Sequence, residues 1–538
     1  ATDAVRIWTV TDGSTGAFGT YATTTTYPAG ELYKNATEDE HGKQVIEFKD
    51  KSGLVILKKV QLTALNDDGI TGQNHDGWLS TYYIYDDLNR LRAVIQPEGV
   101  KHLAKPANNW SSTAISDIIG EQFFRYEYDH RSRMIMKKVP GAGEVYMVYD
   151  KRDRLIMTQD ANMRTGTVRW MVTKYDALNR PTETGILNSS TAFTSHITAA
   201  AAATPGTYPA TTSGYELLSE MGYDNYTGIP SGLSSTFLST WNGYLLAASS
   251  SYPYAQTPQQ STATKGMATW SRTKVLGTAS QYLGTVMLYD DKGRVIQAQS
   301  QNITGGIDVI TTQYSWAGLP LLTIHKQEKA NSPAQTTVSV TKMSYDDLGR
   351  LTATDKRIQN TLVNSNLMSD YKTIATNQYN ALGQLTKKTL APAYDDGDED
   401  DDDGLETLDY NYNIRGWLLG VNREYARETV NKNYFGFDLG YDKQDNQLIG
   451  SQSYTKAQYN GNISGMVWKS KGSGVIRKYD FDYDAANRLL KGDFTQYTGS
   501  SFNTTAGVNY DIKMGDGSQA NVNDAYDYNG NIKRMQQW

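Results

Sequence analysis

A seven-residue phrase recurs along this chain and constrains its fold more than any other feature. It reads Tyr-Asp, two variable residues, Gly or Asn, Arg, and an aliphatic residue. Five clear copies begin at Tyr85, Tyr149, Tyr289, Tyr345 and Tyr483. Weaker copies begin at Tyr128, Tyr175, Tyr314, Tyr379, Tyr412, Tyr441 and Tyr526. The usual interval of about 20 to 35 residues is typical of stacked supersecondary units. The phrase therefore predicts a structural array of repeated units and not one active site.

Each copy predicts a β-hairpin. The residues before the Tyr alternate, as in Val145–Tyr149, and so do the residues after the Arg, as in Leu155–Thr158. Period-two alternation bounded by turn residues is typical of strands. Apart from Ser132, the fifth position holds residues that tolerate a left-handed backbone, which predicts a tight turn with positive φ: Asn89, Ser132, Asp153, Asn179, Gly293, Gly349, Gly383, Gly416, Asn487 and Gly530.

The other fixed positions of the phrase have predicted packing roles. The Asp can accept hydrogen bonds from the turn amides. The regular Arg predicts stacking on a Tyr ring of a neighbouring hairpin. The structural residues predicted in this way are Tyr85, Asp86, Asn89, Arg90, Tyr149, Asp150, Arg154, Tyr175, Asp176, Asn179, Arg180, Tyr289, Asp290, Gly293, Arg294, Tyr345, Asp346, Gly349, Arg350, Tyr483, Asp484, Asn487 and Arg488.

The predicted fold class is therefore all-β. Because a single hairpin is marginal in water, the hairpins must pair in series into a long twisted sheet, and such a sheet buries its edges best by coiling onto itself. Residues 1–79 are expected to be a β-rich entry segment, and residues 80–187 and 273–538 to be repeats. Residues 188–272, rich in Ser, Thr, Ala and Pro, are expected to be a loop-rich insertion with one degenerate repeat. The best helix candidates are Tyr215–Met221 and Ala199–Ala203.

Composition narrows the functional classes. The net charge of -6 over 538 residues gives no general attraction to nucleic acid or to anionic membranes. No stretch approaches the length of a membrane helix, so membrane insertion is not expected. The absence of cysteine excludes disulfides and thiolate sites. Tyr greatly outnumbers Phe, 38 to 11, which suits half-buried strands whose hydroxyl groups reach polar partners.

No catalytic site and no cofactor are predicted. The six histidines are scattered, and paired acidic residues such as Asp86 and Asp87 recur with the turns, which favours turn capping over a glycosidase pair. The acidic run at residues 395–403 contains a weak calcium candidate formed by Glu399, Asp401 and Asp403. Its twelfth loop position would be Tyr410 where an EF-hand needs Glu, which favours a solvated loop.

The repeated phrase resembles the YD repeat of the Rhs (rearrangement hotspot) family, and the resemblance covers most of the chain. Three longer strings look like Rhs proteins of the Bacteroidetes: Tyr27–Lys34, Asp290–Gln297 and Tyr459–Met466. The resemblance implies a spiral β-sheet that closes into a hollow, barrel-like cocoon. In many members the shell encloses a C-terminal toxin and delivers it to competing cells; related shells are toxin-complex subunits and teneurin domains.

The sequence also departs from that family. Family shells usually end in a core segment with self-cleaving Asp-Pro motifs, and no Asp-Pro pair occurs here. The chain is therefore expected to be the shell portion of a longer polypeptide, ending before a core or toxin domain. Some weak copies also lack the Arg, with Gln384, Trp417, Asn446 and Asn531 in its place.

Three functional hypotheses follow. The first is a non-catalytic shell whose partner is its own C-terminal cargo, expected to be a toxin used in interbacterial competition, with secretion-system or cell-surface proteins as further partners. The second is a secreted adhesin or a carbohydrate- or protein-binding module that makes its contacts through residues 188–272. The third, an enzyme, has the least support. The Bacteroidetes resemblance implies a secreted or cell-surface protein, exported through the type IX system.

Overall fold

The computed structural model describes residues 3–69, 74–105, 108–250, 252, 254–395, 404–427, 433–442, 453–505 and 507–538. The chain forms two compact units. Unit 1 consists of residues 1–169, 190–208 and 411–538, and unit 2 consists of residues 170–189 and 209–410. Both are built mainly from antiparallel strands that pair with their neighbours in the sequence, which confirms the all-β prediction.

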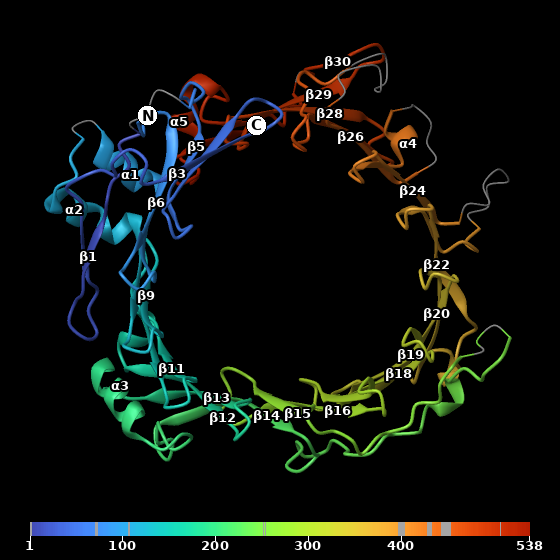
Figure 1. The fold of residues 1–538 in the computed structure, drawn as a ribbon. Helices are drawn as coiled ribbons and strands as arrows, with labels where there is room; N and C mark the ends of the chain where they lie inside the picture. The colour runs from blue at the N-terminus through green and yellow to red at the C-terminus, as the bar shows by residue number, and fades with distance from the viewer. Residues whose placement is uncertain are drawn as a thin grey trace. The chain divides into compact units, whose positions relative to one another are not determined.

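Unit 1 contains the first and last strands of the chain together with the α-helices (Figure 1). Its first part holds β1 (Thr9–Thr11), β2 (Thr20–Ala22), β3 (Tyr33–Glu38), β4 (Gln44–Lys49), β5 (Val55–Gln61), β6 (Trp78–Tyr85), β7 (Leu91–Ile95), α1 (Pro97–Ala104), α2 (Ser112–Gln122), β8 (Phe123–Tyr128), β9 (Met134–Lys138), β10 (Val145–Tyr149), β11 (Leu155–Gln159) and α3 (Phe193–Ala202). Its last part holds β25 (Leu418–Val421), α4 (Arg423–Arg427), β26 (Phe435–Gly440), β27 (Gly465–Ser470), β28 (Ile476–Tyr483), β29 (Leu489–Tyr497), β30 (Phe502–Asn503), β31 (Ile512–Met514), α5 (Val522–Ala525) and β32 (Met535–Gln537).

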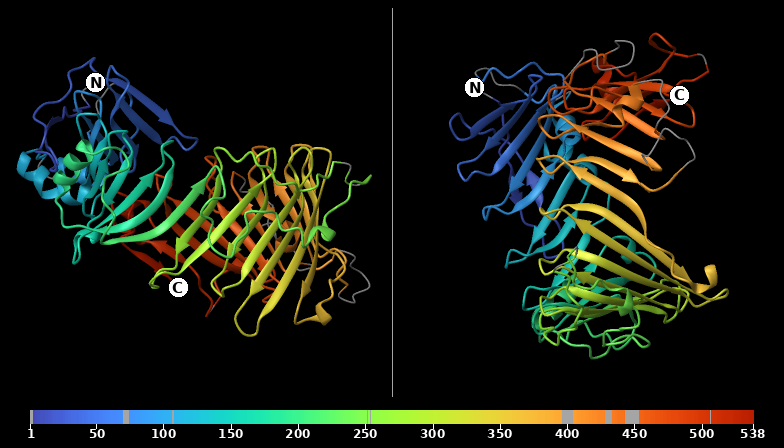
Figure 2. Two further views of the ribbon diagram at one scale, coloured as in Figure 1. Left: turned by 90° about the horizontal axis from the view of Figure 1, so that it is seen from below. Right: turned by 90° about the vertical axis from the view of Figure 1, so that its right-hand side faces the viewer.

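Unit 2 is a single series of longer strands, which lie side by side in Figure 2. They are β12 (Arg169–Tyr175), β13 (Pro181–Asn188), β14 (Tyr215–Tyr223), β15 (Ala268–Lys274), β16 (Tyr282–Tyr289), β17 (Val295–Gln301), β18 (Ile307–Tyr314), β19 (Pro320–Lys329), β20 (Gln335–Tyr345), β21 (Leu351–Asn360), β22 (Lys372–Tyr379), β23 (Leu385–Leu390) and β24 (Glu406–Tyr412). From β13 to β24, each strand pairs antiparallel with the next.

A register shift accompanies the Tyr of the repeat. In the β6–β7 pair the shift falls between Ile84 and Tyr85, and in the β20–β21 pair between Ser344 and Tyr345. The same shift precedes Tyr128, Tyr149, Tyr223, Tyr289, Tyr314, Tyr379 and Tyr483. A bulge bends a strand and increases its right-handed twist. The repeat therefore adds twist at the same end of each hairpin.

The main core of unit 1 lies where the first strands pack against two helices. Trp78, Tyr82 and Phe123 are almost fully buried there and belong to one cluster with Val100 and Leu103 of α1. Pro97 stands at the start of α1, where its missing N–H costs nothing, and the Ser111 side chain caps α2 by accepting a hydrogen bond from the Ala114 amide at 3.3 Å.

One helix prediction was wrong and the other was right. The helix expected at Tyr215–Met221 is strand β14, paired on one side with β13 and on the other with β15. Pairing on both edges satisfies the backbone of this Leu-, Glu- and Met-containing segment and outweighs its helix propensity. The Ala199–Ala203 run does lie in a helix as far as Ala202, the end of α3.

Candidate functional site: the repeated clasp and the seam of unit 1

Each complete repeat forms a compact clasp around its turn. In the first copy, Asp86 Oδ1 accepts hydrogen bonds from the amides of Leu88 and Arg90, both at 3.0 Å. Asp86 Oδ2 accepts from Arg90 Nε at 2.8 Å. The intervening Asn89 has φ 59°. One carboxylate therefore fixes the turn backbone and orients the Arg that follows.

The same clasp recurs with little variation. The distance from Arg Nε to Asp Oδ2 lies between 2.6 and 2.8 Å in all seven complete copies, which pair Arg90 with Asp86, Arg133 with Asp129, Arg154 with Asp150, Arg180 with Asp176, Arg294 with Asp290, Arg350 with Asp346 and Arg488 with Asp484. The left-handed turn predicted at the fifth position is present at all ten residues named above: Asn89, Ser132, Asp153, Asn179, Gly293, Gly349, Gly383, Gly416, Asn487 and Gly530.

The clasp carboxylates of Asp86 and Asp290 are held in their charged form. Burial would raise the pKa of Asp86, but hydrogen bonds from Arg90 and the turn amides outweigh it and lower that pKa below the usual value. The pKa of Asp290 is lowered by the same balance, with Arg294 as the partner. These carboxylates therefore stay ionised and paired, in the manner of structural groups.

The Arg of one clasp reaches the next hairpin. The Arg294 guanidinium lies 4.7 Å from the centre of the Tyr314 ring, and its Nη1 donates to the Ser315 carbonyl at 3.0 Å. Equivalent stacking joins Arg90 to Tyr128, Arg133 to Tyr149, Arg180 to Tyr223, Arg350 to Tyr379 and Arg488 to Tyr526. The predicted contact between neighbouring hairpins is confirmed at these positions.

The Tyr hydroxyl makes a contact in the reverse direction that the sequence did not assign to a partner. Tyr314 Oη donates to the Val295 carbonyl of the preceding hairpin at 3.1 Å, and Tyr345 Oη donates to Pro320 at 2.8 Å. Similar bonds start from Tyr128, Tyr149, Tyr223, Tyr289, Tyr379, Tyr441, Tyr483 and Tyr526. A Phe could fill the same space but could not donate, which explains the excess of Tyr over Phe.

In two repeats that lack the Arg, a neutral side chain in its place keeps the bond across the turn. Asn380 stands in the Asp position and donates from Nδ2 to Gln384 Oε1 at 2.8 Å. Asn531 donates from Nδ2 to Asp527 at 2.7 Å. In the copy at Tyr412, the Arg415 guanidinium lies over the Trp417 ring. Asn446 and the calcium candidates Glu399, Asp401 and Asp403 lie outside the described residues.

Within unit 1 the beginning of the chain is tied to its end, and we call this contact the seam. The Glu98 amide at the start of α1 donates to Asn529 Oδ1 at 2.9 Å, although the two residues are 431 positions apart. The Tyr528 amide donates back to Glu98 Oε2 at 2.9 Å. Asn529 Nδ2 also donates to the side-chain oxygens of Gln96 and Gln122, at 3.0 and 2.9 Å.

Apolar and cation–π contacts strengthen the seam. Leu62, after β5, shares one buried cluster with Leu490, Val522 and Tyr528 near the end of the chain. The Lys101 ammonium lies 4.2 Å from the centre of the Tyr528 ring. Because the same contacts combine buried apolar area with satisfied polar groups, the seam has the character of a structural interface.

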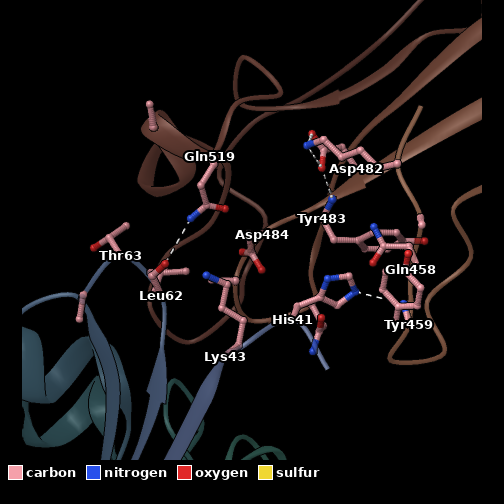
Figure 3. A pocket seen from close by; sticks show the side chains of 16 residues that line it. His41, Lys43, Leu62, Thr63, Gln458, Tyr459, Asp482, Tyr483, Asp484 and Gln519 are labelled. Atoms are coloured by element: carbon pink, nitrogen blue, oxygen red, sulfur yellow. Dashed lines mark hydrogen bonds and ion pairs between the residues drawn. The ribbon is translucent and has the colours of Figure 1, made fainter. Parts of the chain in front are cut away.

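A cavity of about 900 Å³ lies beside the seam (Figure 3). Figure 3 shows His41 and Lys43, from the turn between β3 and β4, facing Tyr459 and Asp484, which lie before β27 and after β28. The Tyr459 amide donates to His41 Nε2 at 3.2 Å, and Gln519 Nε2 donates to the Leu62 carbonyl at 3.2 Å.

The acidic groups of this cavity already have partners. Asp482 pairs with Lys456 at 2.7 Å, and Asp484 belongs to a clasp. Across the described ranges, no group of three or more His, Asp or Glu side chains is placed to hold a metal ion. No helix in that part of the chain is long and apolar enough to span a membrane. The seam therefore joins the first and last parts of unit 1, and a polar cavity lies beside it.

No protein-family model matches the chain, and no curated protein matches it. Solved structures do resemble it. A Tc holotoxin pore of Photorhabdus luminescens with a mutated TccC3 shares 12% identity and a TM-score of 0.44 over 91% of this chain and 21% of that chain. TcdB2-TccC3 without its hypervariable C-terminal region gives 13% identity and a TM-score of 0.49 over 96% of this chain and 22% of that chain. TcdB2-TccC3 itself shares 12% identity with this chain and gives a TM-score of 0.45, over 96% of this chain and 23% of that chain. The chain thus spans less than a quarter of the length of each.

Proposed function

We propose that this chain is the wall of an Rhs-type shell that encloses a cargo polypeptide carried after it, and that it catalyses no reaction itself. The observation that supports this most is the seam. A sheet of hairpins in series has two free edges, and contacts between Glu98 and Asn529 bring the two ends of this series together within unit 1. A wall whose ends are tied can surround a volume without leaving a long exposed edge.

The clasps supply the second requirement of such a wall, which is uniform attachment between hairpins. In six of the complete copies the Arg stacks on a Tyr ring of the next hairpin, and the Tyr hydroxyls of most copies donate to the preceding hairpin. Because these contacts recur along the series, the attachment between hairpins is spread over many junctions. In this proposal the enclosed cargo is a toxin, the protein is secreted or displayed on the cell surface through the type IX system, and delivery serves competition between bacteria.

Protection from protease tests the enclosure. A flexible, protease-sensitive reporter polypeptide is appended after Trp538, and its cleavage is compared with that of the same reporter attached to an unrelated folded protein. Enclosure predicts that cleavage is slower by about a hundredfold, because the protease reaches the reporter only after the wall opens. Equal cleavage rates, measured while the shell itself stays intact, would contradict the proposal.

The second candidate function is a binding module, and one cavity in unit 2 supports it. This cavity of about 550 Å³ is lined by residues 256–262 of the predicted insertion and by Asp291, Lys292 and Trp316. The Trp316 side chain is 66% exposed, and the Lys292 ammonium lies 4.5 Å from its ring centre. An exposed aromatic ring among hydroxyl, carboxamide and carboxylate groups suits the alternating apolar and polar faces of a sugar.

A glycan array separates this candidate from the shell. Binding of the intact chain to a carbohydrate, and its loss in Trp316→Ala with an unchanged melting temperature, would support the module. The matched control is Trp538→Ala, which removes a similarly exposed Trp in unit 1. If no carbohydrate binds, or if Trp316→Ala binds as well as the parent chain, the candidate fails.

A further inference from the structure

An extended segment of unit 2 lies on one face of the sheet without joining it. We call this segment, Ser231–Leu246, the strap; Figure 1 shows the green chain after β14 running along the strands toward β18 and β19. The structure assigns it no strand, and its only regular element is a short 3-10 helix at Asn242–Tyr244. Its backbone polar groups must therefore find partners outside a strand ladder.

Glutamine side chains of the sheet supply those partners. Gln297 of β17 accepts from the Leu238 amide at 2.9 Å and donates to the Leu238 carbonyl at 3.0 Å. Gln313 of β18 does the same with Leu246, at 2.8 and 2.9 Å. A carboxamide that donates and accepts at once reproduces what a neighbouring peptide group does in a β-ladder.

Two further glutamines extend this row along β17. Gln299 accepts from the Ser234 amide at 2.9 Å and donates to the Thr236 carbonyl at 3.3 Å. Gln301 donates to the Ser231 carbonyl at 2.9 Å. Because residues 297, 299 and 301 alternate along one strand, all three side chains point to the same face. We call the four glutamines the glutamine track.

Apolar side chains of the strap anchor it between these polar contacts. Leu233 and Phe237 pack with Trp270, Val286 and Leu288. Trp241, Tyr244, Leu245 and Leu246 pack against a second cluster that contains Leu322, Ile324, Val338 and Val340. Apolar side chains thus hold the strap at a few positions, and hydrogen bonds of its backbone hold it at several others.

The choice of glutamine separates this face from an ordinary core. Gln297 is 0% exposed, and Gln299 and Gln313 are each 1% exposed. Val or Leu at these positions, as in β19 and β20, would leave the amides and carbonyls of the strap without partners, whereas each buried carboxamide satisfies them. A carboxamide is satisfied both by water and by a peptide backbone, so the track tolerates an empty state as well as a filled one.

We propose that the glutamine track is a binding site for an extended polypeptide, recognised through its backbone amides, and that the strap is an exchangeable occupant of that site. The ligand class is an unfolded or extended chain with apolar residues at the spacing of Leu233 and Phe237 and with few requirements elsewhere. Such a face would hold a polypeptide that has not folded. The proposal does not depend on the enclosure of cargo proposed above.

Peptide exchange tests the proposal. Protease recognition sequences are inserted at Thr227 and at Ala248, both in exposed stretches that flank the strap, and the strap is cut free of the chain. A fluorescent peptide with the strap sequence is then added and followed by anisotropy. The track predicts that this peptide replaces the cut segment, and that N-methylation at Leu238 and Leu246 weakens its binding by about tenfold or more, because each methyl group removes a donor.

Side-chain changes in the peptide provide the matched control. Replacing Ser235, Ser239 and Thr240 of the peptide with Ala leaves the bonds to the glutamine track in place and should change its affinity by less than about threefold. If the N-methylated and native peptides bind equally well, or if the cut segment is never exchanged while the protein stays folded, the proposal is wrong.

Hydrogen exchange on the uncut chain gives an independent measurement if cutting disturbs the fold. In Gln297→Leu the Leu238 amide should exchange about tenfold faster, because it loses its acceptor. The β17 amides should be unchanged, because the groups outside the strap that bond to Gln297 are the side chains of Thr311 and Gln299 and the strand ladder stays in place. The control is Gln259→Leu, an exposed glutamine of the same region. If the Leu238 amide exchanges as slowly as the β17 amides in both variants, the strap opens only with the whole sheet and is not exchangeable.

Discussion

At the scale of single residues, the clasp explains why the phrase is so regular. The Asp fixes the turn, the left-handed residue lets the chain reverse, the Arg binds forward, and the Tyr hydroxyl binds backward. The first two roles depend on residues within one turn, and the forward contact of the Arg was predicted from the regular recurrence of Arg and Tyr along the chain. The Tyr hydroxyl partner lies about one hairpin away, and the sequence offered only the excess of Tyr as a signal.

Replacing the Arg of a clasp should destabilise the wall. Arg294→Ala removes the bond to Asp290, the bond to the Ser315 carbonyl and the stacking on Tyr314, and should lower the free energy of unfolding by about 1–3 kcal/mol. Urea unfolding measures this. The control is Arg131→Ala, whose ion pair with Asp153 is 43% and 45% exposed and should contribute less than about 0.5 kcal/mol. An equal effect of the two substitutions would contradict the assigned role.

Replacing a glycine of the turn with Ala should destabilise the protein for backbone reasons alone. Gly383 has φ 81°, and an added Cβ would meet nothing within 4 Å. Gly383→Ala should therefore cost about 1 kcal/mol through strain in the left-handed region. Gly472→Ala is the matched control, because that site is equally open and has no positive φ. If the two melting temperatures fall equally, the left-handed turn does not carry the cost.

At the scale of elements, strands next to repeat turns were predictable and elements defined by distant partners were not. The strands at Val145–Tyr149 and Leu155–Gln159 follow their alternating patterns. Strand β14 has the composition of a helix and is a strand only because β13 and β15 bind its edges. Helices α1 and α2 interrupt the series between β7 and β8, and the start signals at Pro97 and Ser111 were the only local trace of them.

Strand β6 is held at its start by a histidine whose charge state should couple stability to pH. His75 Nδ1 lies 3.1 Å from Ser80 Oγ, and its Nε2 lies 3.2 Å from Tyr82 Oη. Burial, with smaller contributions from Lys59 and Arg6, lowers the pKa of His75 to about 3. The folded protein therefore favours neutral His75, while the unfolded chain binds a proton near the ordinary pKa.

This difference in pKa fixes the direction in which the stability changes with pH. The stabilisation from His75 is complete above about pH 6.5 and is lost as the pH falls below it, at no more than about 1.4 kcal/mol per pH unit. His75→Gln should flatten the fall in unfolding free energy between pH 6 and pH 4, whereas His130→Gln, at an exposed turn position, should leave it unchanged. Identical pH dependence in the parent chain and in His75→Gln would refute the assignment.

At the scale of the whole chain, the seam could not be predicted from the sequence. Nothing local marks Asn529 as a partner for Gln96, Glu98 and Gln122, because the contact forms only when the ends of the series meet. The family resemblance implied a closed shell, and the enclosure proposed above rests on the seam within unit 1. The glutamine track was equally hidden, since its glutamines and the strap are about 60 residues apart.

Loss of the seam should be measurable without any cargo. Asn529→Ala removes bonds to three residues of the first part of unit 1 and should destabilise that unit by about 2 kcal/mol, because three half-buried partners lose a hydrogen bond. Asn531→Ala is a matched control in the same turn, since Asn531 bonds only to the nearby Asp527. Equal thermal shifts would show that the seam contributes no stability.

The enclosure is tested most directly by locating an appended domain. Electron cryo-microscopy of the chain with a reporter domain after Trp538 should show extra density surrounded by the repeat sheet, and Asn529→Ala should increase the fraction of opened particles. Extra density outside the sheet, or a sheet whose first and last strands lie apart in the parent chain, would contradict the account.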